Sequence, residues 1–241
     1  MSFDKILSKK NKLNPVKEDY WIPLSDLMTG LMMIFMLIAI SYMIKNEDET
    51  KKIKNMAIIY DEMRMQLYDE LNMEFKQDLI KWDAQLDKNL MIRFKNPNVL
   101  FDTGQAGLKP KFTEILDDFF PRYIKILSSK KYKDSIEEVR IEGHTSSVWS
   151  VNTPENQAYF LNMELSQSRT RSVLQHVLLL PKIEKQQQWL KEHLTANGLS
   201  SSKILYDLNG QENKEGSQRV EFMVRTNADA RISDILKTVQ K

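Results

Sequence analysis

The chain has 241 residues, a length that suits one or two compact units. Charged side chains make up 28% of it and apolar ones 41%, and a net charge of +2 gives no sign of a nucleic-acid-binding stripe. The absence of cysteine excludes disulfides and thiolate metal sites.

The first predicted element is a transmembrane helix over residues 21–44, after a short polar tail at residues 1–20. Asp26 is the only ionisable side chain in this apolar run. The run from Ile22 to Ile44 within it rises about 34 Å as a helix, which is enough to cross the hydrocarbon core of a bilayer. Trp21 and Tyr42 lie near its ends, and aromatic rings are typical of the membrane interface.

A cleaved signal peptide is the alternative for this run, with Ala39-Ile40-Ser41 as its cleavage signal. The run is too long for that, and an acidic residue early in it does not suit a signal peptide. Five lysines precede the span and four follow it closely, so the charge bias only slightly favours a cytoplasmic N-terminus.

Residues 45–89 contain neither Gly nor Pro and predict a helical linker. Apolar side chains recur in it every three or four residues and form one helical stripe. The first five have the heptad spacing of a parallel pair of helices, and a helix packed on its own domain explains the stripe equally well. The stripe consists of Ile53, Met56, Tyr60, Met63, Leu67, Leu71, Phe75, Leu79, Trp82 and Leu86.

Residues 90–241 alternate between strand-like and helix-like patterns. This alternation predicts an α/β or α+β sandwich with helices on one face of a sheet. Strands are expected at 90–94, 136–142, 202–208 and 219–225. Helices are expected at 111–127, 156–180 and 183–197, with a turn at 96–98 and a polar helix or tail at 228–241.

Asp26 is the sharpest chemical feature of the sequence. A carboxylate within a bilayer is costly, so it tends to face protein or water and to mark a functional site. Such a group can take up a proton on one side of the membrane and release it on the other. Thr29 and Gly30 share its helical face, where Thr29 can hydrogen-bond the carboxyl group and Gly30 lets another helix approach. The alternative is that Asp26 only snorkels to the headgroups.

The string from Trp21 to Phe35, with Ser-Asp-Leu-Met-Thr-Gly-Leu-Met inside it, resembles the transmembrane helix of MotB-type stator subunits. In that family an Asp a few residues after a Trp carries protons through a motor channel, which implies this role for Asp26, with Thr29 beside it. The resemblance also implies a homodimer, with five MotA-type membrane partners around two copies. The flagellar type has an amphipathic plug after the span, whereas residues 45–51 are too polar for one. The long uninterrupted helix resembles the Zorya anti-phage defence type, whose partner is ZorA-like.

Residues 99–227 resemble the OmpA-like peptidoglycan-binding domain. The matching strings are Gly143-His144-Thr145, the run from Asn162 to Arg169, and Gln218-Arg-Val-Glu-Phe222.

In the OmpA-like family, an Asp directly after Gly-His-Thr binds the ammonium of diaminopimelate, and the Arg of Leu-Ser-x-x-Arg binds its carboxylate. Arg169 is present here, but Ser146 stands in place of the Asp and cannot form the same ion pair. Asn162 and Leu165 match the family's wall-binding segment. Arg169 suits a bidentate pair with a carboxylate, and a structural salt bridge is its alternative role.

No metal site, cofactor or enzymatic centre is expected. His144 is expected to shape the loop after its strand, and His176 and His193 are not clustered with it. The sequence has no phosphate-binding loop, nucleophile elbow or paired catalytic carboxylates.

The sequence therefore predicts the wall-anchored subunit of a proton-driven motor in the bacterial inner membrane, with a cytoplasmic N-terminus and a periplasmic C-terminal domain. A flagellar-type stator subunit and a passive peptidoglycan anchor without ion flux are the alternatives.

Overall fold

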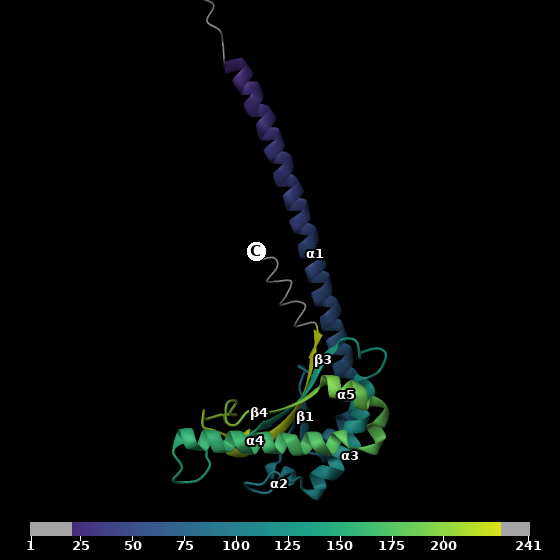
Figure 1. Cartoon of the computed structure of the whole chain (residues 1–241), viewed down its shortest axis with the longest axis vertical. Helices are drawn as coiled ribbons and strands as arrows, with labels where there is room; N and C mark the ends of the chain where they lie inside the picture. The colour runs from purple at the N-terminus through teal and green to yellow at the C-terminus, as the bar shows by residue number, and fades with distance from the viewer. Residues whose placement is uncertain (1–20, 228–241) are drawn as a thin grey trace, which may run out of the picture. The chain divides into compact units, whose positions relative to one another are not determined.

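The computed structural model describes residues 21–227, and the side chain of Met56 within this range is not described. The expectations for the tail at 1–20 and for 228–241 lie outside the described residues. The chain divides into two compact units, Met1–Lys52 and Ile53–Lys241. Its elements (Figure 1) are α1 Trp21–Lys81, β1 Ala84–Leu86, β2 Met91–Phe94, α2 Pro97–Leu100, α3 Pro110–Leu127, β3 Ile136–His144, α4 Glu155–Leu178, the 3-10 helix η1 Pro181–Gln186, α5 Gln187–His193, β4 Leu194–Gly198, α6 Lys214–Ser217 and β5 Arg219–Thr226.

The described part of the first unit is the N-terminal part of α1. Every residue from 21 to 52 is exposed, including the large apolar side chains. A helix that is apolar on all sides is typical of a membrane span. Of the helices in residues 21–227, α1 alone is long and apolar enough to cross a membrane.

The C-terminal part of α1 belongs to the second unit and lies in its core. Leu67, Leu71, Phe75 and Leu79 are buried there. Packing on the helix's own domain, one of the two explanations of the apolar stripe, therefore holds for this stretch.

The expected helical linker ends earlier than predicted, at Lys81. The amide of Trp82 still donates to the carbonyl of Asp78, but Asp83 adopts a positive φ of 50°. This left-handed conformation ends the helix. Residues Ala84–Leu86 then pair with β2 as an edge strand that the sequence analysis missed.

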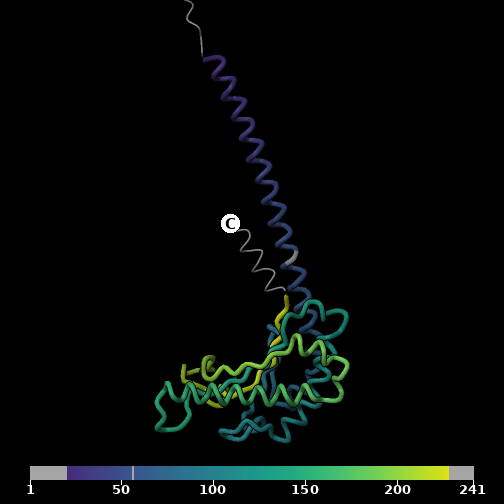
Figure 2. The backbone as a smooth tube through the Cα atoms, viewed as in Figure 1, coloured from purple at the N-terminus to yellow at the C-terminus, as the bar shows by residue number. Residues whose placement is uncertain are grey.

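The sheet of the second unit has the order β1-β2-β5-β3-β4. All its neighbouring strands are antiparallel except β3 and β4, which are parallel. Figure 2 shows how the chain brings β2 and β5 together from distant parts of the sequence.

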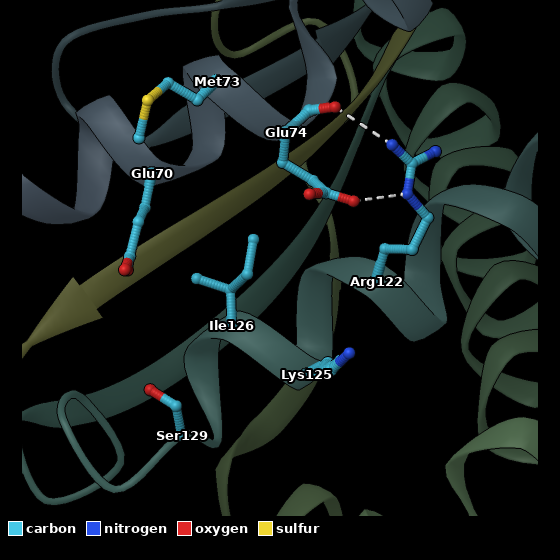
Figure 3. Close-up of a pocket in the computed structure, with 7 residues that line it drawn as sticks. All are labelled: Glu70, Met73, Glu74, Arg122, Lys125, Ile126 and Ser129. Atoms are coloured by element: carbon cyan, nitrogen blue, oxygen red, sulfur yellow. Dashed lines mark hydrogen bonds and ion pairs between the residues drawn. The ribbon is translucent and has the colours of Figure 1, made fainter.

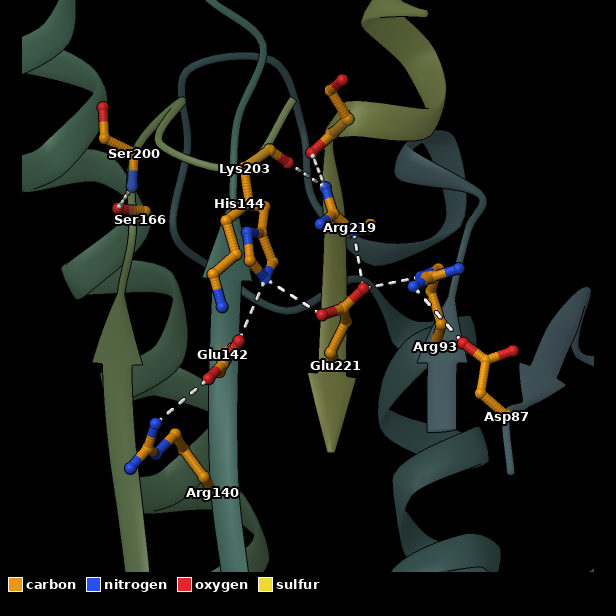
Figure 4. A network of polar contacts seen from close by, with 11 residues as sticks. Asp87, Arg93, Arg140, Glu142, His144, Ser166, Ser200, Lys203, Arg219 and Glu221 are labelled. Carbon is orange, nitrogen blue, oxygen red and sulfur yellow. Dashed lines mark hydrogen bonds and ion pairs between the residues drawn. The ribbon is translucent and has the colours of Figure 1, made fainter. Parts of the chain in front are cut away.

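The two faces of the sheet differ in chemistry because successive side chains alternate between them. Val139 and Ile141 of β3 and Phe222 of β5 lie in the apolar core with α1, α3, α4 and α5. Glu142 and Glu221 point to the opposite face (Figure 4). The prediction of helices on one face is confirmed.

Two predicted elements are wrong. The expected helix at 183–197 is η1 and α5 followed by strand β4, because residues 194–198 pair with β3. The expected strand at 202–208 is a turn with one isolated bridge, Tyr206 to Glu212. The Ser217 hydroxyl accepts a hydrogen bond from the backbone amide of Leu205. A side chain therefore binds a backbone group that a neighbouring strand would bind in a sheet. The other predicted strands and long helices are confirmed within about two residues.

An arginine joins α1 to α3 beside a surface pocket of about 470 Å³ (Figure 3). Arg122 of α3 donates from Nε to the Glu74 carboxylate over 2.7 Å and from Nη2 to the Glu74 carbonyl over 3.0 Å. Its Nη1 also lies 3.0 Å from Oδ2 of Asp78. These contacts fix the buried end of α1 against the domain.

Two glycines let α4 approach the sheet closely. Gly143 and Gly198 are paired in the parallel register of β3 and β4. A Cβ atom on Gly198 would lie 2.2 Å from the backbone nitrogen of Gln167, and one on Gly143 would lie 3.0 Å from the Ser166 carbonyl oxygen. Only glycine fits where helix backbone meets strand backbone.

Candidate functional site

The predicted wall-binding residues lie on the loop after β3 and on α4. Asn162, Leu165 and Arg169 follow one another at intervals of three and four along α4, so they share one helical face. The Asn162 amide donates to the Ser146 carbonyl over 3.1 Å. The structure therefore joins Ser146 to Asn162, while Leu165 is half-buried beside them on the helix.

The Arg169 side chain contacts the segment after α2. Its Nε donates to the Gln105 carbonyl over 2.9 Å, and its Nη2 donates to the Asp102 carbonyl over 3.2 Å. The guanidinium carbon lies 4.8 Å from the centre of the Phe101 ring. Sequence reasoning missed these three partners, because they lie far before Arg169 in the sequence and two of them bind through backbone carbonyls.

Arg169 is a buried cation that has no counter-ion among the described residues. The residue is 7% exposed, and burial lowers its pKa to about 10. Within residues 21–227 no carboxylate forms an ion pair with it, so the structural salt bridge that the sequence left open is wrong for this part of the chain. An uncompensated buried charge costs free energy, and an anionic ligand would recover it.

A carboxylate also lies beside Ser146, although it comes from a distant segment. Glu212 accepts from the Ser147 amide over 2.8 Å and from the Ser147 hydroxyl over 2.5 Å. The Ser146 hydroxyl itself donates to the Val148 carbonyl over 3.4 Å. Glu212 was not singled out in the sequence because it lies 66 residues after Ser146.

The membrane residues Asp26 and Thr29 lie on the exposed part of α1. The Thr29 hydroxyl donates to the Ser25 carbonyl over 2.8 Å rather than to Asp26. A Cβ atom on Gly30 would meet no atom of the described chain within 4 Å. This face is thus open to another helix, and the pairing of Thr29 with Asp26 stays a prediction.

A buried polar network occupies the sheet face opposite the apolar core (Figure 4). Glu221 accepts through one oxygen from Arg93 over 2.6 Å and from Arg219 over 2.7 Å. Its other oxygen lies 3.2 Å from Nε2 of His144, which in turn lies 3.5 Å from Glu142.

The network keeps its two glutamates ionised. Burial opposes this for Glu221, but contacts with His144, Arg219 and Arg93 outweigh burial and lower its pKa. The His144 contact is also the main cause of the lowered pKa of Glu142.

The three histidines lie apart, as the sequence suggested. His176 lies 2.7 Å from Asp117, and the His193 ring stacks on Trp189 at 4.6 Å. His144 is buried between two carboxylates, of which only Glu142 is a near neighbour in sequence. Spacing could therefore not reveal this group.

The fold resembles that of a MotB-like protein from Desulfovibrio vulgaris, with a TM-score of 0.50 and 23% identity over 70% of this chain and 98% of that one. An apolar N-terminal helix, a helical region and a mixed-sheet domain with a MotB-like fold define the class, and the predicted fold class is confirmed.

The particular family is shown by sequence. The Zorya protein ZorB of Escherichia coli strain Crooks is 48% identical over 235 residues, which cover 97% of this chain and 99% of the relative. A Zorya protein ZorB of Escherichia coli O139:H28 is 22% identical over 235 residues, covering 90% and 84%. No protein-family model matches the chain. The chain belongs to the ZorB family of Zorya proteins.

Proposed function

We propose that this chain is the cell-wall-anchored subunit of a proton-driven inner-membrane motor in anti-phage defence, working with a ZorA-like, MotA-type partner. Membership of the ZorB family supports the defence role. The long apolar stretch of α1 supports a single membrane span, and the MotB-like domain that follows it would then lie in the periplasm. The observation that carries the motor proposal is Asp26, the only acidic or basic side chain between Trp21 and Ile44 apart from the Tyr42 phenol.

The surroundings of Asp26 support a partner protein. Every residue from 21 to 52 is exposed, so no described residue of this chain covers the carboxylate. A carboxylate facing lipid is costly, and proteins cover such groups with other helices or with water-filled paths. A ring of MotA-type subunits, five around a homodimer of this chain, would supply both the cover and the proton path.

Wall attachment is proposed for the face formed by Ser146, Asn162, Leu165 and Arg169. The stem peptide of peptidoglycan carries carboxylates, and the uncompensated guanidinium of Arg169 is the matching cation. The cavity beside it is only about 10 Å³, room for about one water. Binding therefore requires the loop that contacts Arg169 to move aside.

Glu212 is proposed to take the role that Ser146 cannot. An ammonium group of the ligand needs an anion, and the Ser146 hydroxyl is neutral. The Glu212 carboxylate is held next to this position by two hydrogen bonds from Ser147. An ion pair would then form with a residue from another segment.

The motor proposal is tested by phage plaque counts on cells that carry the complete defence system. Asp26→Asn should abolish protection while leaving expression and membrane insertion intact. Asp48→Asn is the matched control, because Asp48 forms only an exposed ion pair with Lys52 beyond the apolar run. Full protection by Asp26→Asn would contradict proton carriage and favour a passive wall anchor.

A further inference from the structure

The starting observation is a pair of like charges directly opposite each other on two strands. Glu142 of β3 and Glu221 of β5 are partners in the antiparallel register. Each residue is only 2% exposed. Like charges in this position destabilise a sheet unless a cation lies between them.

The arginines of the network serve only one oxygen of each carboxylate. Arg93 and Arg219 both donate to Oε1 of Glu221, and Arg140 lies 3.4 Å from Oε1 of Glu142. The two Oε2 atoms face Nε2 of His144 instead. The buried carboxylates thus keep one oxygen each for a shared centre.

Nε2 of His144 and Oε2 of Glu142 do not meet the geometry of a hydrogen bond. Neither atom has a hydrogen-bond partner within residues 21–227, despite their short separation. A hydrogen bond needs one oxygen on the N–H axis. Here two oxygens flank the nitrogen at 3.2 and 3.5 Å.

These separations suit the coordination of one metal ion. Zinc ligands lie about 2.0–2.2 Å from the ion, so two ligands of a tetrahedral site are about 3.4 Å apart. The three ligand atoms of Glu142, His144 and Glu221 all lie within 4.8 Å of one another. One imidazole and two carboxylates form a donor set that zinc and neighbouring divalent transition metals accept.

We propose that Glu142, His144 and Glu221 bind one divalent transition-metal ion of the zinc class, which ties β3 to β5 directly before the loop that carries Ser146. Glu142 also lines a pocket of about 280 Å³.

The arginines act as outer partners that hold the carboxylates. The positive charge of Arg93 is shared with Asp87 at 3.5 Å, and that of Arg140 with Glu138 at 2.5 Å. Arg219 is left with Glu221 as its only carboxylate partner in the described part of the chain. This excess charge opposes the metal, so the site should bind less tightly than a closed structural zinc site.

The test is zinc binding by the full chain in detergent after removal of bound metal, followed by equilibrium dialysis against Zn²⁺ alone. We expect one zinc per chain. Glu142→Gln and His144→Gln should weaken binding by more than the roughly 10–100-fold that follows loss of an outer partner. His176→Gln is the matched control and should bind as the wild type does.

A second measurement, the zinc X-ray absorption spectrum of the wild type, needs no substitution. It therefore tests the proposal even if the variants fail to fold. One imidazole with oxygen ligands is the expected signature, and a zinc ion bound only by oxygen would overturn the proposal. Equal binding by wild type, Glu142→Gln and His144→Gln would also overturn it. Absence of binding by the folded wild type would overturn the proposal as well.

Discussion

Residues 21–52 and residues 53–227 are helical and apolar in places, yet they use apolar side chains in opposite ways. Phe35 in the first region is 61% exposed, whereas Phe75 in the second is fully buried, although both lie on α1. The first region presents apolar groups on every side, whereas in the second one apolar stripe of α1 is buried in the core of the domain. One continuous helix can therefore suit two different environments. The distribution of apolar side chains around each part of the helix determines which environment that part suits.

The largest difference is expected between truncations of these two phenylalanines. Phe75→Ala should lower the free energy of unfolding of the sheet domain by about 3–5 kcal/mol, because it leaves a cavity beside Phe119 and Trp82. Phe35→Ala removes the same atoms from a lipid-facing position and should leave that free energy unchanged. Urea titration of the full chain in detergent, followed by near-ultraviolet circular dichroism, measures both. Equal effects would contradict the division of α1.

Acid should destabilise the second region through its buried carboxylates. The pKa values of Glu142 and Glu221 are lowered in the folded state. Below the ordinary glutamate pKa of about 4.3 the unfolded chain binds more protons, so stability present at neutral pH is lost as the pH falls. Each unit of pKa separation corresponds to about 1.4 kcal/mol.

The measurement is the melting temperature of wild type and Glu221→Gln as the pH falls from neutral into this acidic range. The variant should be less stable at neutral pH, because Arg93 and Arg219 lose their shared carboxylate. Its further loss on acidification should be smaller than that of wild type. Parallel curves would show that Glu221 does not titrate in this way.

Arg169 should matter for wall attachment. A charge-assisted bond to a carboxylate contributes about 1.5–3 kcal/mol, so Arg169→Ala should weaken binding to purified sacculi about 10–150-fold. Arg171→Ala is the matched control, since Arg171 is exposed on the same helix. Glu212→Gln should weaken binding, and Ser146→Asp should strengthen it.

Circular dichroism must confirm that each variant is folded, because Arg169 also holds the carbonyls of Asp102 and Gln105. A folded Arg169→Ala that binds like wild type would contradict the assignment of the site.

The smallest expected effect is in cross-linking between two copies of the chain that pair along α1. Met63 is half-buried in one chain and has room for a neighbour, whereas Leu71 is fully buried in its own domain. A cysteine at Met63 should cross-link two chains, and a cysteine at Leu71 should not. Met56, a second position for this experiment, lies outside the described side chains. Failure of the Met63 cross-link with good expression would count against a parallel pair.

Strong periodic patterns in the sequence predicted most helices and strands correctly. Such patterns could not predict contacts between residues that are distant in the sequence. The stripe of α3 and the alternation in β5 specify their elements locally. Strand β4, by contrast, forms because Leu194–Gly198 pairs with β3, and its five residues carry no strand pattern of their own.

The candidate sites, like the helices and strands, include a part that the sequence predicts and a part that only the fold reveals. The helical spacing of Asn162 and Arg169 was readable from the sequence. The approach of Glu221 to Glu142, and of Glu212 to Ser147, depends on how the chain folds back across the sheet.

The glycine contact between α4 and the sheet has a mechanical consequence. At Gly198 the backbone of α4 lies against the backbone of β4, without side chains between them. Side chains can yield by changing rotamer, but two backbones in contact have no such slack. A force applied to α4 at Asn162 or Arg169 is therefore transmitted to β3 and β4 with little deformation of the contact between them. The proposed role as the anchor of a motor would require this stiffness against torque, and Gly198→Ala would separate the layers that provide it.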